Sequence, residues 1–168
     1  MSFARHMLIV GGIALALWGM AYGLWYAVFA EHQALDGIGA SLSTSFASAA
    51  ERRPEGAHAA LGQYRETKYV YDRQVDVHSH WIGLAMILIV LGIALDRVIF
   101  AERIKLALSL AAFLGAVFFP LGVLLQTVDR GSTPGSIAVV GSALLIIALI
   151  GFAFGFVRTR LRPDARAN

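Results

Sequence analysis

The sequence predicts an all-α integral membrane protein, a four-helix bundle with a helical insertion on its outer, periplasmic side. Hydrophobic residues make up 58% of the 168 residues and charged residues only 15%, a composition too apolar for a soluble domain of ordinary surface. The apolar residues are concentrated in four blocks separated by charged segments. Each block is about as long as a helix that crosses the ~30 Å hydrocarbon core of a bilayer.

The first predicted span covers residues 7–30, a run of 24 residues without a charge. At ~1.5 Å per residue this helix is about 36 Å long. It is too long for the apolar region of a signal peptide, so we expect an uncleaved span. A stripe of small residues on the helix would let a neighbouring helix approach closely; its members are Gly12, Ala16, Gly19 and Gly23.

Residues 31–76 form a long polar insertion before the second span. Its apolar residues recur every three or four positions, which predicts an amphipathic helix continuing out of the membrane; they are Leu35, Ile38, Leu42, Phe46 and Ala49. A break at 51–56 and a second short helix at 57–71 follow. Such helices are expected to lie on the membrane surface or to cap the bundle.

The remaining predicted spans are residues 77–95, 106–128 and 136–157, with a charged link at 102–105 and a short turn at 131–135. The net charge of +3 lies mainly at helix ends, which indicates membrane orientation and argues against a nucleic-acid partner. Lys and Arg favour the N-terminus, the 96–105 link and the C-terminus, so both termini are expected in the cytoplasm and the protein in the inner (plasma) membrane. This orientation puts several polar side chains on the outer side: His32, His78, His80, Gln126 and Asp129.

The residues that can carry chemistry stand where the insertion meets the second span: Asp76, His78, His80 and Trp81. The chain has no cysteine, so a metal would be held by His, Asp, Glu, Met or backbone groups. If this segment is helical, the two histidines point ~200° apart. One of them would then be an axial ligand of haem b beside Trp81, and His32 or a histidine of a second copy would supply the other axial ligand.

Two other interpretations stay open. If residues 76–80 are extended, both imidazoles fall on one side and can share copper or zinc with Asp76, His32 or Asp129. Alternatively, the histidines bond headgroups, loop carbonyls or a partner subunit at the membrane boundary, and the protein is a structural subunit. For Gln126 and Asp129 the structural interpretation is favoured, because polar residues are expected where a helix leaves the bilayer.

The segment 78–83, with Gly19 and Gly23 in the preceding span, resembles the start of the catalytic subunit of haem–copper oxidases and nitric oxide reductases. More specifically, it is similar to small four-helix membrane proteins related to that subunit. The resemblance implies that His78 or His80 ligates a low-spin haem on the outer side. The insertion is longer than in those proteins, and the later helices that carry the other metal ligands are missing, so oxygen or nitric oxide reduction would need a partner.

We therefore expect a small haem-binding or electron-transfer component, or an accessory subunit of a respiratory-type complex. The chain on its own is not expected to be an enzyme. The lipid bilayer and other membrane subunits, or a second copy of the chain, are the expected partners.

Overall fold

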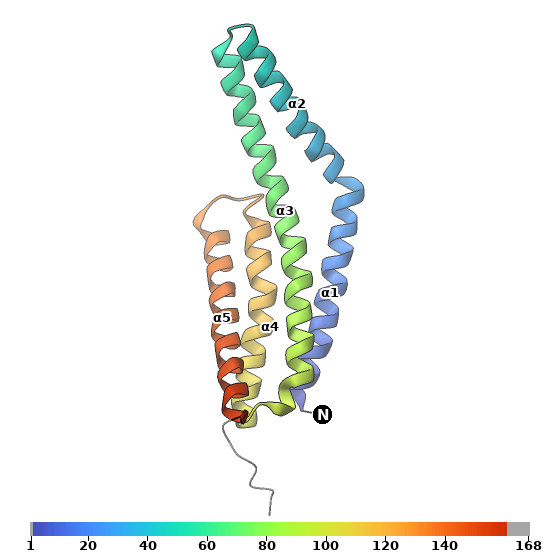
Figure 1. Ribbon diagram of the computed structural model, residues 1–168, viewed down its shortest axis with the longest axis vertical. Helices are drawn as coiled ribbons and strands as arrows, with labels where there is room; N and C mark the ends of the chain where they lie inside the picture. The colour runs from blue at the N-terminus through green and yellow to red at the C-terminus, as the bar shows by residue number, and fades with distance from the viewer. Residues whose placement is uncertain (1, 161–168) are drawn as a thin grey trace, which may run out of the picture.

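The computed structural model describes residues 2–160, including the side chains as far as Arg158, and every regular element in this part of the chain is helical. Five α-helices follow one another, with a short 3₁₀ turn, η1 (Leu95–Arg97), between the third and fourth (Figure 1). They are α1 (Phe3–Phe29), α2 (Glu31–Ala50), α3 (Pro54–Ala94), α4 (Glu102–Leu125) and α5 (Ser132–Arg160). Helices α1, α3, α4 and α5 are long and apolar enough to cross a membrane, which supports the predicted helical membrane bundle.

The spans begin earlier than the apolar runs suggested. Helix α1 starts at Phe3 because Ser2 caps it, its hydroxyl accepting a hydrogen bond from the backbone N–H of Arg5 at 3.3 Å. Helices α4 and α5 each begin four residues before their predicted spans, and α4 ends at Leu125. The charged and turn-forming residues before the apolar runs form the first turns of α4 and α5, and the first turn of a helix tolerates such residues well.

The predicted break after α2 is present as a turn before Pro54, but the predicted short helix at 57–71 and the second span are one helix, α3. It is one continuous helix of 41 residues, about 60 Å long. The polar residues before the span belong to its exposed surface, where Lys68 pairs with Asp72 at 2.7 Å and Arg73 approaches Asp76 at 3.9 Å. These pairs have helical spacing, and no glycine or proline lies between residues 63 and 82. The charged residues therefore lie on the surface of a helix and do not interrupt it.

The insertion is a helical hairpin made of α2 and the outer half of α3, residues 54–76. It projects along the long axis of the bundle, beyond the ends of α4 and α5, rather than lying across the end of the bundle (Figure 1). Helix α2 is where the apolar spacing predicted it, but the face that it buries is polar. Ser41, Ser45 and Ser48 are at most 7% exposed, whereas Phe46 is 73% exposed.

The spans associate as two close pairs, α1 with α3 and α4 with α5. In the second pair, a Cβ added at Gly122 would lie 2.8 Å from Cα of Ala138, and one added at Gly141 would lie 2.8 Å from the carbonyl carbon of Phe118. Backbones this close require glycine. Helix α4 also contacts α3 and α1, so it joins the two pairs. One core cluster runs through all four spans, and it includes Leu15, Trp81, Ala116 and Phe152.

Candidate functional site

Both histidines of the predicted motif lie on α3, because residues 76–80 are fully helical. The extended segment that would let both imidazoles chelate one ion is therefore absent from this structure. Residues two apart on a helix diverge by ~200°. His78 is directed at α1 and His80 at α4, as their contacts show.

His78 fills a notch in the surface of α1. Its imidazole lies against Gly23, where a Cβ would come within 2.9 Å of Nε2 and closer still to Cε1 and Nδ1. The ring also bonds the backbone oxygen of Gly19 through Nδ1 at 2.9 Å. Since a carbonyl can only accept, Nδ1 carries the proton. The small-residue stripe of α1 thus receives a neighbouring helix as predicted, and His78 is the side chain that enters it.

His80 is held by its own helix instead. Its Nδ1–H donates to the backbone oxygen of Asp76 at 2.6 Å. The ring stands edge-on to Phe119 of α4, with centroids 4.9 Å apart and planes at 90°. The proton on Nδ1 leaves the lone pair on Nε2, which is the tautomer of a metal-ligating histidine whose other nitrogen is bound to a carbonyl.

The Nε2 atoms of both histidines remain available. Within the part of the chain that the structure describes, neither atom makes a hydrogen bond, and neither is among the buried polar atoms without a partner. Neither atom is therefore fully buried, but the Nε2 of His78 borders the Gly23 notch of α1, whereas His80 makes no such contact with a neighbouring backbone in the described chain.

Trp81 belongs to the packed core. It is 3% exposed and lies between two aromatic rings of α1, with centroid distances of 5.9 Å to Trp18 and 5.3 Å to Tyr22. It also lines an apolar cleft of about 290 Å³ between α1, α3 and α4. The remaining lining residues of the cleft are Leu15, Trp18, Val117, Leu121 and Leu124. A volume of this size is at the lower end for small-molecule sites.

The other predicted ligands are not assembled around these histidines. Asp129 accepts the backbone N–H of Gly131 at 2.8 Å through Oδ1, which is a local turn contact on an exposed side chain. The Asp76 carboxylate lies 3.9 Å from the guanidinium of Arg73 on the same helix. Among residues 2–158, no group of three or more His, Asp or Glu side chains is placed to hold a metal. Copper or zinc would need ligands from another chain.

His32 lies apart from the motif as well. It is exposed in the first turn of α2, nine residues along the chain from Gly23, whose notch holds His78. At 1.5 Å per residue this corresponds to about 14 Å along the helix axis. One chain therefore does not place His32 and His78 at the same level, as two axial ligands of one haem would require.

Sequence reasoning missed the contact that anchors the α4–α5 loop to α3. Arg130 pairs with the Glu66 carboxylate through both of its terminal nitrogens and lies 4.6 Å from the ring centroid of Tyr69. This contact holds the pKa of Glu66 below its usual value, chiefly through the hydrogen bond from Arg130. The two charges are 64 residues apart, so no local pattern pairs them.

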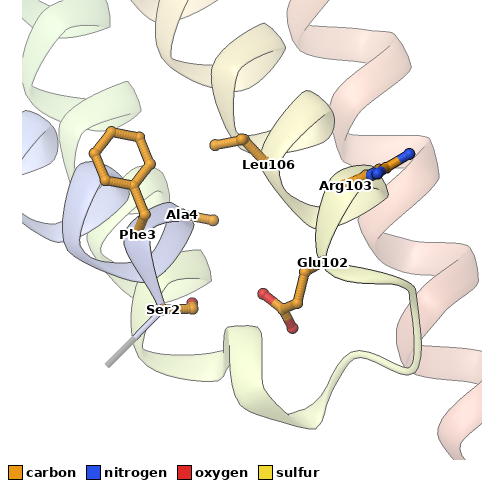
Figure 2. A pocket seen from close by; sticks show the side chains of 6 residues that line it. All are labelled: Ser2, Phe3, Ala4, Glu102, Arg103 and Leu106. Atoms are coloured by element: carbon orange, nitrogen blue, oxygen red, sulfur yellow. The ribbon is translucent and has the colours of Figure 1, made fainter.

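A second cavity lies at the opposite end of the spans, between the N-termini of α1 and α4. Its volume is about 500 Å³, and Figure 2 shows Phe3 and Leu106 on its walls with Glu102 and Arg103 beside them. The cavity contains none of the predicted site residues, and its open rim is formed by the first turns of both helices.

Comparison of the chain with models of known protein families, with curated proteins and with solved structures gives no match. The resemblance to the haem–copper oxidase subunit therefore stays a prediction.

Proposed function

We propose that the protein is a small integral-membrane haem-binding or electron-transfer component, or an accessory subunit of a respiratory-type complex, with His80 as an axial ligand of haem b. The observation that carries the proposal is the state of the His80 imidazole. Its Nδ1 is bound to the Asp76 carbonyl at the start of the apolar half of α3, and its Nε2 is free.

His80 is a better candidate than His78 because the hydrogen bond of His78 joins two helices, whereas that of His80 lies within one. The His78 ring ties α3 to α1 through the Gly19 carbonyl and the Gly23 notch, so ligand binding would compete with helix packing. The His80 hydrogen bond lies within one helix, so its Nε2 can bind a ligand without separating two spans. Phe119 adds an aromatic wall beside it.

The described residues fit one axial position of a haem. A second strong ligand would come from another chain, since His32 lies in a different part of the molecule. A bound haem would supply one-electron transfer. The protein would fix the imidazole orientation through Asp76, and this hydrogen bond would raise the basicity of Nε2.

The proposed location is the inner membrane with both termini in the cytoplasm. The arrangement supports this orientation, because Arg5, Arg97, Arg103, Lys105 and Arg158 belong to helix ends that gather at one end of the bundle (Figure 1). Such clustering of basic residues is typical of the cytoplasmic side. His80 and the hairpin would then lie toward the outer side.

The test is an absorption spectrum of the purified protein, as isolated and after addition of haem b. We expect a Soret band in the wild type, its loss in His80→Ala, and its retention in His78→Ala. His78→Ala should instead lower the free energy of unfolding by about 1–3 kcal/mol, because it removes a hydrogen bond and leaves a notch in the helix contact. A wild type that retains no haem after unbound haem is removed by gel filtration overturns the proposal, and so does a Soret band that survives this step in His80→Ala. Stoichiometric copper or zinc in a colourless protein would favour the metal-binding alternative.

A further inference from the structure

Three polar side-chain atoms are buried where α1 and α3 meet at the outer end of the spans, without a hydrogen-bond partner among the described residues. They are the hydroxyl oxygens of Tyr22 and Tyr26 on α1 and the Oε1 atom of Gln74 on α3. Tyr26 as a whole is only 7% exposed. Folded proteins leave few buried polar atoms unpaired, because each one gives up its hydrogen bonds to water. Three such atoms in one helix contact therefore indicate a bound ligand.

Gln74 lies on the face of α3 that packs against α1. Tyr71, three residues before it, contacts Tyr26 with ring centroids 6.5 Å apart. His78, four residues after it, fills the Gly23 notch. Residues three and four apart share one face of a helix, so Gln74 lies between these two contacts with α1.

The two tyrosines lie on the matching face of α1. They are four residues apart, which is about 6 Å along the helix axis, and Gly23 lies between them in the sequence. The Tyr22 ring stands edge-on to Trp81 of α3, with centroids 5.3 Å apart. The three unpaired atoms therefore belong to the stretch of the α1–α3 contact that also holds the His78 ring.

The chemistry of the three groups fits water. A tyrosine hydroxyl can donate and accept a hydrogen bond, whereas an amide oxygen only accepts. A ligand that joins them must therefore donate to Gln74 and pair with the hydroxyls. Water can do both, and a buried water molecule typically makes about three hydrogen bonds to groups that are otherwise unsatisfied. None of the three groups carries a charge, which favours a neutral ligand over a cation.

The position of the group gives water a way in. Tyr26 is in the last turn of α1, and Gln74 belongs to the hairpin part of α3. The site therefore lies at the outer end of the spans, next to the part of the molecule that projects beyond α4 and α5 (Figure 1).

We propose that the α1–α3 contact binds ordered water between Tyr22, Tyr26 and Gln74. The water donates a hydrogen bond to Oε1 of Gln74 and pairs with the two tyrosine hydroxyls. It also brings solvent to the His78 imidazole, whose Nε2 carries a lone pair and is not fully buried. The site is independent of haem and does not involve His80.

The first test is the sign of the stability change when one hydroxyl is removed. If the Tyr26 hydroxyl is hydrated, Tyr26→Phe loses a hydrogen bond, and we expect the unfolding equilibrium constant in an SDS titration to rise about two- to tenfold. If the hydroxyl is dry, its removal relieves a desolvation cost and the constant falls, which would overturn the proposal. Tyr71→Phe is the matched control, because the Tyr71 hydroxyl is not among the buried unpaired atoms; its constant should change less than about twofold.

A double-mutant cycle tests whether the groups share the water. Gln74→Met keeps the approximate shape of the side chain and removes the acceptor. Members of one hydrogen-bonded network change stability non-additively, so the fold-change of the double variant Tyr26→Phe, Gln74→Met should be at least about threefold smaller than the product of the single fold-changes. A double variant that equals the product would rule out a shared site.

X-ray radiolysis gives a direct readout, because hydroxyl radicals formed from bound water modify the side chains beside it. We expect Tyr26 to be modified several-fold faster than Phe152, which is 1% exposed in the apolar core, and more slowly in Gln74→Met than in the wild type. Equal protection of Tyr26 and Phe152 would contradict the proposal. These measurements need no haem, so their failure leaves the assignment of His80 standing.

Discussion

The two halves of α3 meet their partners in opposite ways. The inner half inserts large side chains into a helix with glycines at the contact, with His78 against Gly23 and Trp81 beside Gly19. The outer half contacts α2 through serine and small residues, and Ala60 is its only fully buried apolar side chain before Val77 in the described chain. The same helix thus makes a closely packed contact through its inner half and a contact with little buried apolar surface through its outer half.

This difference follows from the surroundings of the two halves, because lipid surrounds the spans and water surrounds the hairpin. In a bilayer, burying apolar surface between helices gains little, so association relies on close approach and interhelical hydrogen bonds. In water, the burial of apolar surface is the main source of stability, and the hairpin buries little apolar surface. We therefore expect the hairpin to open more readily than the spans.

Filling the Gly23 notch should have the largest effect. In Gly23→Ala the new Cβ would overlap the His78 ring, which is also held by the Gly19 carbonyl, so the two helices would separate. We expect a loss of about 1–3 kcal/mol in the free energy of unfolding, measured as a lower midpoint of SDS-induced unfolding by circular dichroism. Gly83→Ala is the control on the inner half of α3, since a Cβ there meets nothing within 4 Å. Equal midpoints for the two variants would mean that the notch is not a tight contact.

The turn of the hairpin should give an intermediate effect of opposite sign. Arg52 has a φ of 57°, a left-handed conformation that costs a side-chain-bearing residue about 1 kcal/mol. Arg52→Gly should relieve much of this cost and slow hydrogen exchange in α2 and the outer half of α3. Exchange in residues 81–94 should not change. Arg65→Gly, inside a helix, should accelerate exchange in the hairpin instead, and a similar acceleration in Arg52→Gly would contradict the assignment of strain to the turn.

The smallest effect should come from the ion pair that fastens the α4–α5 loop to the outer half of α3. Because the hydrogen bond from Arg130 lowers the pKa of Glu66 in the folded protein, the pair stabilises the fold above the unfolded pKa of Glu66. Its contribution is lost as the pH falls through the folded pKa. The thermal midpoint of the wild type should therefore exceed that of Glu66→Gln slightly at about pH 6, and the two should converge below about pH 4. A difference that persists in acid would show that the side chain acts by packing.

Much of the fold was readable from the sequence because the bilayer imposes a simple rule. An apolar run of sufficient length becomes a helix, and each of the four predicted runs falls on a long apolar helix, although the first extends one residue and the third three residues past the end of its helix. The 3.5-residue spacing of Leu35, Leu42 and their neighbours predicted α2 correctly. The same pattern did not reveal which face of α2 packs on α3, since serine–backbone bonds and close approach decide that contact.

The candidate site was predictable only in part. The motif located two histidines at the start of the second span, and helix geometry predicted that they diverge if the segment is helical. The sequence left that condition open. It also could not show that Gly23 receives the His78 ring, because the two residues are 55 positions apart and meet only when α1 and α3 pack.

The amino-acid sequence alone predicts apolar helices of membrane length, basic residues at the helix ends on one side and two histidines at the start of the second span. Each of these properties follows from local composition and spacing. The packed helices were needed to show that α3 runs unbroken from the hairpin into the span, and that His78 fills the Gly23 notch of α1 while His80 is held by its own helix. Those outcomes depend on which helix faces which, and distant residues acquire that relation only when the helices pack.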